Sequence, residues 1–343
     1  MLRYAVIFVL AALISIIFTP VARRIAYRFG AIDIPDDERR IHNKPIPRMG
    51  GLAIYISFVI CSLIFSKFNT HVVGIIAGGT ILVIAGMIDD VKPLRPVQKL
   101  IFQIAASAVL IAFGITIGSI TVPFIADGES VYIGYFGIPL TILWVVGITN
   151  AVNLIDGLDG LAAGLAMIFS ITIFVVSMIS NREVAMLLTA ILAGSCLGFL
   201  PYNFNPASIF MGDTGSQFLG FTLAAISTQG AVKSAAAVTL AVPILVLWLP
   251  IFDTLFAMVR RKVNKRPIME ADRGHLHHRL LDLGLSHRKV VIIMYLISIF
   301  LGATAVLAMV LSTQKSYVIL LLVCFITLSI GVEFGFITRK TRN

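Results

Sequence analysis

The sequence has little charge. Only 13% of its 343 residues are Asp, Glu, Lys or Arg, whereas a soluble domain usually carries about 25%. Hydrophobic residues make up 58% of the chain, and its mean hydropathy is +0.98. Apolar runs as long as a membrane helix, about 17 residues or more, recur along its whole length. The low charge therefore excludes an ordinary soluble protein and predicts an integral membrane protein.

Cysteine is also scarce. The three cysteines, Cys61, Cys196 and Cys324, all fall inside apolar runs, so they suit packing and offer no disulfide framework or metal site. A cleavage site of small residues is lacking after the first apolar run, Leu2 to Pro20, so we expect a retained span rather than a signal peptide. No long polar stretch interrupts the runs, and we expect one membrane domain, residues 1–343.

The apolar runs predict an all-α polytopic protein with eleven transmembrane helices. The spans cover residues 2–20, 50–66, 71–88, 98–118, 138–154, 160–180, 184–200, 214–230, 235–260, 289–311 and 316–337. An odd number of spans places the termini on opposite sides. Most of the 27 Lys and Arg residues fall at one set of span ends, and basic residues mark the cytoplasmic side. We therefore expect the N-terminus outside and the C-terminus in the cytoplasm.

One predicted outer segment differs from the rest. Ser119 to Gly137 alternates apolar residues around Asp127 and Gly128, which is typical of a β-hairpin. We expect a small extracytoplasmic hairpin without a catalytic role.

Polar residues gather in five clusters, all at predicted cytoplasmic ends of spans. The clusters are Ile41–Gly51, Asp89–Asp90, Thr149–Gly164, Pro201–Ser216 and Asp272–Leu281. The predicted outer loops contain no comparable cluster. A basic cytoplasmic face with these clusters would attract an anionic substrate or lipid.

The paired acids Asp89 and Asp90 would lie at the carboxyl end of a helix, where negative charge is disfavoured. Together with Asp213 and Asn153 they could converge around a cation, and hard oxygen ligands favour Mg²⁺, with Mn²⁺ as an alternative. The plainer interpretation is that Asp89 and Asp90 are solvated loop acids and that Asp213 is a helix N-cap.

Asn150, Asn153 and Asp156 recur at intervals of three residues, which places them on one face of a helix. Asp159 follows and could be either a site residue or an N-cap. The glycines nearby could pack helices together or let a phosphate approach the backbone.

Three histidines lie between two arginines in the last cluster: His275, His277 and His278, with Arg273 and Arg279. A zinc site would need a fourth ligand at the spacing of a zinc finger, and the sequence has none there. We therefore interpret these histidines and arginines as donors to phosphate oxygens.

The segment "HNKPIPRMGG" combines stiff prolines with basic residues. Lys44 and Arg48, with Asn43 beside them, could bind a diphosphate, because the prolines would hold this segment rigid. A simple loop turn is the alternative.

Taken together, the motifs resemble the polyprenyl-phosphate N-acetylhexosamine-1-phosphate transferase superfamily, the family 4 glycosyltransferase-like enzymes. The resemblance runs from "HNKPIPRMGG" through "DD", "NAVNLIDGLDGLAAG" and "NPASIFMGDTGSQFLG" to "HLHH". The H-x-H-H form is similar to the WecA/TagO branch, whereas MraY-type enzymes usually carry three consecutive histidines and ten spans.

This resemblance implies an enzyme of the bacterial plasma membrane with its active site facing the cytoplasm. It would transfer N-acetylglucosamine 1-phosphate, or a related sugar phosphate, from a UDP-sugar to undecaprenyl phosphate and release UMP. This is the first membrane step of cell-wall or surface glycopolymer synthesis, and it requires Mg²⁺. Its partners are these two substrates and membrane lipids, not nucleic acid, and the sequence leaves a homodimer open.

The resemblance also implies roles for individual residues. Asp213 and Asn153 would hold the metal, and Asp89 and Asp90 would hold or deprotonate the lipid phosphate. Asp156 would position the diphosphate or the metal, with His277 and His278 contacting the sugar or diphosphate. The residues expected around the nucleotide are Asp159, Asn203 and Phe210, with Asn150, His275, Arg273 and Arg279 as further substrate-binding residues.

Two alternatives stay open at this point, an MraY-type transferase of phospho-N-acetylmuramoyl-pentapeptide and a transporter. Transporters bind their substrates near mid-bilayer in paired repeats. Here the acids inside predicted spans, Asp253 and Glu333, lie near the cytoplasmic ends, and no inverted repeat is evident. Asp253 is unexplained; it could pair with a loop arginine or have a function of its own.

Overall fold

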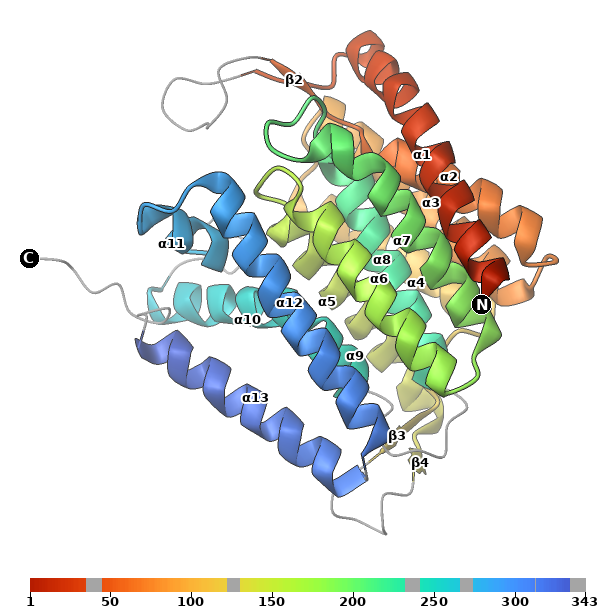
Figure 1. The fold of residues 1–343 in the computed structure, drawn as a ribbon, viewed down its shortest axis with the longest axis vertical. Coiled ribbons are helices and arrows are strands. Elements are labelled where there is room, and N and C mark those ends of the chain that lie inside the picture. Colours follow the sequence, from red (N-terminus) through yellow and green to blue (C-terminus); the bar gives the residue numbers. More distant parts are fainter. Residues whose placement is uncertain (35–44, 122–129, 232–240, 266–273, 312, 334–343) are drawn as a thin grey trace, which may run out of the picture.

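The computed structural model describes residues 1–34, 45–121, 130–231, 241–265, 274–311 and 313–333. In these ranges the chain is a bundle of helices (Figure 1). The α-helices are α1 (Leu2–Phe29), α2 (Gly51–Phe65), α3 (Thr70–Val91), α4 (Pro96–Ala112), α5 (Gly137–Ile155), α6 (Leu161–Ile179), α7 (Glu183–Asn203), α8 (Gly212–Ala231), α9 (Ala241–Val246), α10 (Trp248–Val263), α11 (Leu276–Asp282), α12 (His287–Val310) and α13 (Thr313–Glu333), with a short 3₁₀-helix, η2 (Gly134–Phe136), before α5.

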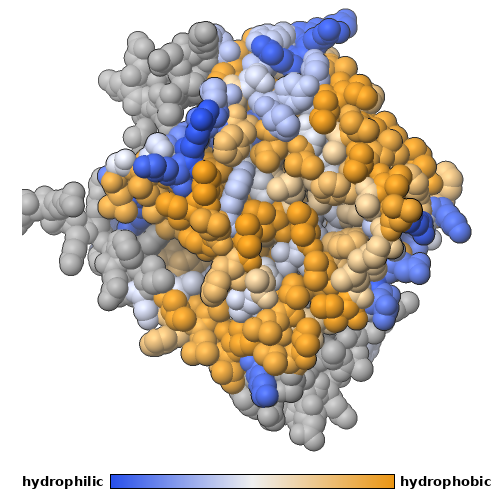
Figure 2. Space-filling model, viewed as in Figure 1, coloured by the Kyte–Doolittle hydropathy of each residue, from blue (hydrophilic) through white to orange (hydrophobic). Residues whose placement is uncertain are grey.

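Six of these helical segments are long and apolar enough to cross a membrane: α1, α3, η2 with α5, α6, α7 and α12. Many large apolar side chains lie exposed on the surface, and the face in Figure 2 is mostly hydrophobic. Such an exposed surface is typical of contact with lipid. The structure therefore confirms an all-α integral membrane protein, while the count of eleven spans and their orientation stay predictions.

The core forms around α6, α7 and α8. α7 packs against α1, α2 and α6, and α8 packs against α3 and α5. Buried hydroxyl groups inside the bundle bond to carbonyls of their own helix; Thr149 donates to Val145 O over 2.6 Å and Ser170 to Ala166 O over 2.7 Å. This self-pairing satisfies polar groups where no water is available.

The predicted span 235–260 is not one straight helix. α9 ends at Val246, and after Leu247 the chain continues as α10, which runs crosswise to α12 in Figure 1. The break has a local cause: Pro250 has no N–H to donate to the Val246 carbonyl four residues before it, and its ring crowds that carbonyl.

Two small antiparallel strand pairs complete the described chain. β1 (Ile32–Asp33) pairs with β2 (Ile46–Pro47), which the sequence did not predict. β3 (Ser119–Thr121) pairs with β4 (Ser130–Tyr132) within the segment expected to be a hairpin. The predicted turn at Asp127 and Gly128 lies outside the described residues, and its extracytoplasmic location stays a prediction.

Candidate functional site

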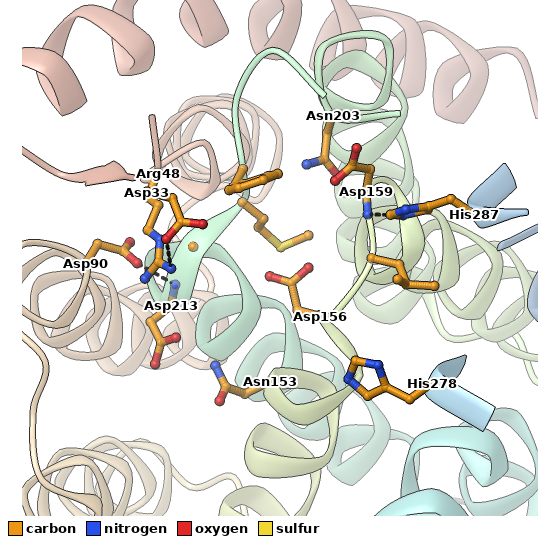
Figure 3. Close-up of a pocket in the computed structure, with 15 residues that line it drawn as sticks. Asp33, Arg48, Asp90, Asn153, Asp156, Asp159, Asn203, Asp213, His278 and His287 are labelled. Carbon is orange, nitrogen blue, oxygen red and sulfur yellow. Dashed lines mark hydrogen bonds and ion pairs between the residues drawn. The ribbon is translucent and has the colours of Figure 1, made fainter. Parts of the chain in front are cut away.

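A cavity of about 320 Å³ opens where the ends of several helices meet the β1–β2 pair (Figure 3). Nine residues predicted from sequence line it: Arg48, Asp90, Asn153, Asp156, Asp159, Asn203, Phe210, Asp213 and His278. Residues that the sequence reasoning missed also line it: Asp33, Gly157, Leu158, Met211, Gly212 and His287. Of the other predicted residues, Asn43, Lys44 and Arg273 lie outside the described residues.

Asp90 ties the end of α3 to the first turn of α8. Its carboxylate accepts hydrogen bonds from the Asp213 N–H at 2.9 Å, the Thr214 N–H at 3.1 Å and the Thr214 hydroxyl at 2.6 Å. This contact needs close helix packing: a Cβ on Gly86, one turn before Asp90, would clash with the Thr214 backbone. Gly212, just before Asp213, has a φ of +71°, a conformation that favours glycine. Asp90 therefore anchors α8, and both of its oxygens already accept hydrogen bonds.

Lys99, near the start of α4, joins Asp213, which lines the cavity, to Asp89, which lies outside the lining. Its ammonium lies 2.9 Å from Asp89 Oδ2 and 2.6 Å from Asp213 Oδ2. Asp89 also accepts a bond from the Leu94 N–H at 2.7 Å, and it does not line the cavity. The structure thus pairs Asp89 with Lys99 instead of placing it as a free metal ligand. A lysine in the first turn of an apolar helix was the signal in the sequence that could have revealed this contact.

Asp213 is held at the cavity by its own helix and by α5. Gln217, one turn along α8, donates to Asp213 Oδ2 over 3.0 Å. Asn153 of α5 donates to Ser216 Oγ over 2.8 Å, and its side chain also bonds to Asp213. These contacts bring the two predicted metal ligands, Asp213 and Asn153, side by side.

Asn150 pairs with a glutamine on the neighbouring helix α4. Its amide nitrogen donates to Gln103 Oε1 over 2.8 Å, and its oxygen accepts from Gln103 Nε2 at 3.2 Å. One turn deeper in the bundle than Asn153, Asn150 does not line the cavity. In the structure Asn150 pairs α5 with α4, because a buried amide needs a partner, and its substrate-binding role stays a prediction.

Asp156, which caps α5, lies between the two halves of the cavity in the view of Figure 3. No hydrogen bond to its carboxylate is found within the described part of the chain. The pKa of Asp156 is raised to about 8, first by burial and then by the nearby charges of Asp213 and Asp90, which Arg48 only partly offsets. A bound cation beside Asp156 would therefore stabilise its ionised carboxylate, whereas another anion there would destabilise it.

No three His, Cys, Asp or Glu side chains come close enough together to hold a metal in the residues that the structure describes. The donor set at the cavity is two carboxylates and an amide, from Asp156, Asp213 and Asn153. Hard oxygen donors of this kind suit Mg²⁺, which keeps several waters and binds phosphate oxygens as well. The raised pKa of Asp156 fits the same ion, since burial and the neighbouring carboxylates outweigh the positive charge of Arg48. These residues therefore fit a magnesium ion bound together with a phosphate substrate.

Three segments form the opposite wall of the cavity. The carboxylate of Asp159 accepts bonds from Asn205 Nδ2 at 3.0 Å and from the Ala207 N–H at 3.1 Å. Asn203 accepts from the Gly160 N–H at 3.1 Å and donates to Ile209 O over 3.1 Å. These bonds tie the loop after α5 to the segment before α8.

His287, at the start of α12, accepts a hydrogen bond from the Asp159 N–H at 2.9 Å. Phe210 lies in the same wall, with its backbone N–H donating to Pro47 O over 2.8 Å. A flat ring beside amide and carboxylate groups makes this wall suitable for a nucleobase.

Arg48, the residue after β2, reaches the cavity, and its partner is Asp33 of β1 at 2.5 Å. Asp33 is buried, whereas Arg48 is partly exposed. The ion pair keeps a guanidinium beside three acids, where it can bind a diphosphate bidentately.

The predicted histidines separate into three environments. His278 lines the cavity. His277 is buried, packs against Gly157, and both of its ring nitrogens are without a partner in the described chain. Burial lowers the pKa of His277 to about 3. His275 does not line the cavity, because its ring pairs with Asp253, and Arg279 donates to Gly274 O over 3.1 Å outside the cavity.

Comparison with known proteins gives one family. The family model described as glycosyl transferase family 4 matches residues 72–231. A Bacillus subtilis protein named probable undecaprenyl-phosphate N-acetylglucosaminyl 1-phosphate transferase is 43% identical, over 89% of this chain and 85% of the relative. A Mycolicibacterium smegmatis decaprenyl-phosphate N-acetylglucosaminephosphotransferase is 38% identical, over 83% of this chain and 77% of the relative.

A more distant relative carries a different substrate in its name. The phospho-N-acetylmuramoyl-pentapeptide-transferase of Caldicellulosiruptor bescii is 34% identical, over 79% of this chain and 86% of the relative.

Proposed function

The chain belongs to glycosyl transferase family 4, and from that premise we propose how its cavity carries out the reaction. The protein is an integral membrane enzyme that transfers N-acetylglucosamine 1-phosphate to a polyprenyl phosphate. We propose that residues 1–343 form one transferase domain, that the donor is UDP-N-acetylglucosamine and that the acceptor is undecaprenyl phosphate. The observation that carries the mechanism is the cavity, which gathers five acids, an arginine and two histidines near the ends of apolar helices.

The donor would lie across the cavity. The uracil fits the wall of Asp159, Asn203 and Phe210, and the diphosphate fits between Arg48 and His278. Asp156, Asp213 and Asn153 would hold Mg²⁺, which neutralises phosphate charge when bound. In this arrangement Asp90 fixes α8 and Lys99 holds Asp213, so that both place the acids before substrate arrives.

The chemical step is an in-line displacement at phosphorus. An oxygen of the lipid phosphate attacks the sugar-bearing phosphorus, and the bond from that phosphorus to the bridging oxygen of the donor breaks, so that UMP leaves with the electron pair. A phosphomonoester has a second pKa of about 6, so the lipid phosphate is largely deprotonated at neutral pH and needs no dedicated base. The protein contributes alignment of two anions and fixed positive charge.

The test is release of UMP by the purified protein in detergent with undecaprenyl phosphate. UDP-N-acetylglucosamine and UDP-N-acetylmuramoyl-pentapeptide are compared, each with Mg²⁺, with Mn²⁺ and with EDTA. We expect release with the simple sugar alone, lost with EDTA and restored by excess Mg²⁺. Release with only the pentapeptide donor would contradict the proposed donor, and full activity in EDTA would contradict the metal.

A further inference from the structure

One buried acid, Asp253 of α10, has no part in the cavity described above. Its side chain is 4% exposed, and it lies in the middle of α10. Oδ2 lies 2.8 Å from Nδ1 of His275, and Oδ1 accepts a hydrogen bond from the Leu276 N–H at 2.8 Å. Asp253 and His275 are more than twenty residues apart in the chain, so the sequence alone does not reveal that they pair. Both oxygens are therefore bound to the start of the histidine-bearing helix α11.

A second contact between α10 and the start of α11 strengthens this connection. Arg260 Nη1 donates to Gly274 O over 2.9 Å. Asp253 and Arg260 are seven residues apart, which is about two helical turns, so they lie on one face of α10. Both are buried. This face of α10 thus holds the backbone at Gly274, just before α11, and at Leu276, its first residue.

The histidines of α11 are placed by this attachment. The rings of His275 and His277 are stacked, with centroids 5.8 Å apart and planes 7° apart, and His277 contacts His278 with centroids 4.3 Å apart. His277 fills the space beside Gly157, where a Cβ would clash with its ring. The stack therefore runs from Asp253 to His278, which lines the cavity.

We infer that Asp253 is a positioning residue: through its hydrogen bonds to His275 and Leu276 it fixes α11 and holds His278 at the cavity. Asp253 itself does not line the cavity, and both of its oxygens are occupied. It acts on the substrate only through α11. The inference rests on the proposed function in one respect, that His278 contacts the sugar nucleotide.

The kinetic experiment compares Asp253→Ala with Asp253→Asn. Alanine removes both acceptors, whereas asparagine is isosteric, keeps an oxygen for the Leu276 N–H and can pair with His275 through its amide. For Asp253→Ala we expect the KM for UDP-N-acetylglucosamine to rise at least tenfold and the KM for undecaprenyl phosphate to stay within twofold. We expect Asp253→Asn to keep the donor KM within threefold. Asp282→Asn, which removes the same kind of charge from the exposed end of α11, is the control.

A second experiment measures the position of α11 without using activity. Diethyl pyrocarbonate modifies accessible imidazoles, and mass spectrometry gives the rate at each histidine. In the wild-type protein His275 and His277 are buried and should react slowly. In Asp253→Ala both rates should rise at least fivefold, while those of Asp253→Asn and Asp282→Asn stay at the wild-type value. His275→Ala, measured for His277 alone, is a second variant in case Asp253→Ala does not yield folded protein.

The outcomes separate the inference from the proposed function. Faster labelling with a raised donor KM supports the inference. Faster labelling with an unchanged donor KM also supports it, and contradicts the proposed contact of His278 with the donor. Unchanged labelling in both Asp253→Ala and His275→Ala overturns the inference. The inference is also overturned if Asp253→Asn raises the donor KM and the labelling rates as much as Asp253→Ala does. The effect would then not depend on the hydrogen bonds that asparagine keeps.

Discussion

At the scale of single residues, Asp213 is the acid most directly placed at the proposed reaction. We predict that Asp213→Asn lowers turnover at least a hundredfold, because the amide removes one negative ligand and weakens the bond to Lys99, 2.6 Å away. Thermal unfolding in detergent should change little, since Lys99 keeps its contact with Asp89. Glu183→Gln, at the exposed start of α7, serves as control. Near-normal turnover would remove Asp213 from the proposed metal set.

His277 predicts a pH dependence of stability. Its pKa is about 3 in the folded protein, below the ordinary value of about 6.5 expected in the unfolded chain. The unfolded chain therefore binds the proton more readily, and stability is lost as the pH falls below about 6.5. At one pH unit below that value the loss is about 1.4 kcal/mol.

The measurement is the midpoint of thermal unfolding at pH 7.5 and pH 5.5 for wild type and His277→Gln. Glutamine does not titrate. Between pH 7.5 and pH 5.5 the unfolding midpoint of the wild-type protein should therefore fall by roughly 2 °C more than that of His277→Gln. An equal fall in both proteins would show that His277 is not buried in its neutral form.

Several site residues were out of reach of sequence reasoning because their partners are distant in the chain. Asp33 meets Arg48 only after β1 pairs with β2. His287 looks like an ordinary polar residue at the start of a span, and its bond to Asp159 joins segments more than a hundred residues apart. Asn150 shares the spacing of Asn153, but spacing cannot show that Gln103 takes up its amide.

At the scale of elements, the contact of α3 with α8 positions the acids. We predict that Gly86→Val lowers turnover at least tenfold and destabilises the protein by roughly 1–3 kcal/mol, because its side chain would push α3 away from the Thr214 backbone. Asp90 would then lose its bonds to the first turn of α8. The assay is UMP release together with thermal unfolding.

Gly147 provides the matched control on another helix. A Cβ at Gly147 of α5 meets no atom within 4 Å, so Gly147→Ala should keep both turnover and stability. A Gly86→Val variant that behaves like Gly147→Ala would show that the close approach of α3 and α8 is not needed.

The sequence predicted those helices whose position is determined by the length of an apolar run. Long runs such as α6 and α7 were predicted to within a few residues at most ends, because a buried apolar helix of this length has few alternatives in a membrane. The separate helices α9 and α10 were not predicted, since hydropathy averages over the break that Pro250 causes. The pair β1–β2 was missed because two-residue strands carry no periodic pattern.

At the scale of the whole molecule, the distribution of Lys and Arg predicts the side from which the donor enters. We predict that inside-out membrane vesicles, whose cytoplasmic face is exposed, release UMP when UDP-N-acetylglucosamine is added outside. Sealed right-side-out vesicles should release less than a tenth as much, because a nucleotide sugar cannot cross the bilayer. Opening both preparations with detergent should make the rates equal; equal rates before opening would contradict the predicted orientation.

The Lys99 ammonium between Asp89 and Asp213 has a consequence for the life of the protein in the cell. A cluster of acids that depended on a dissolved ion would stay strained until that ion arrived. Here Lys99 is a counterion within the chain itself, so we expect the protein to fold in the membrane without the proposed Mg²⁺. If the proposed metal is needed, we expect its depletion to leave folded but inactive enzyme, which regains activity without new translation once the metal returns.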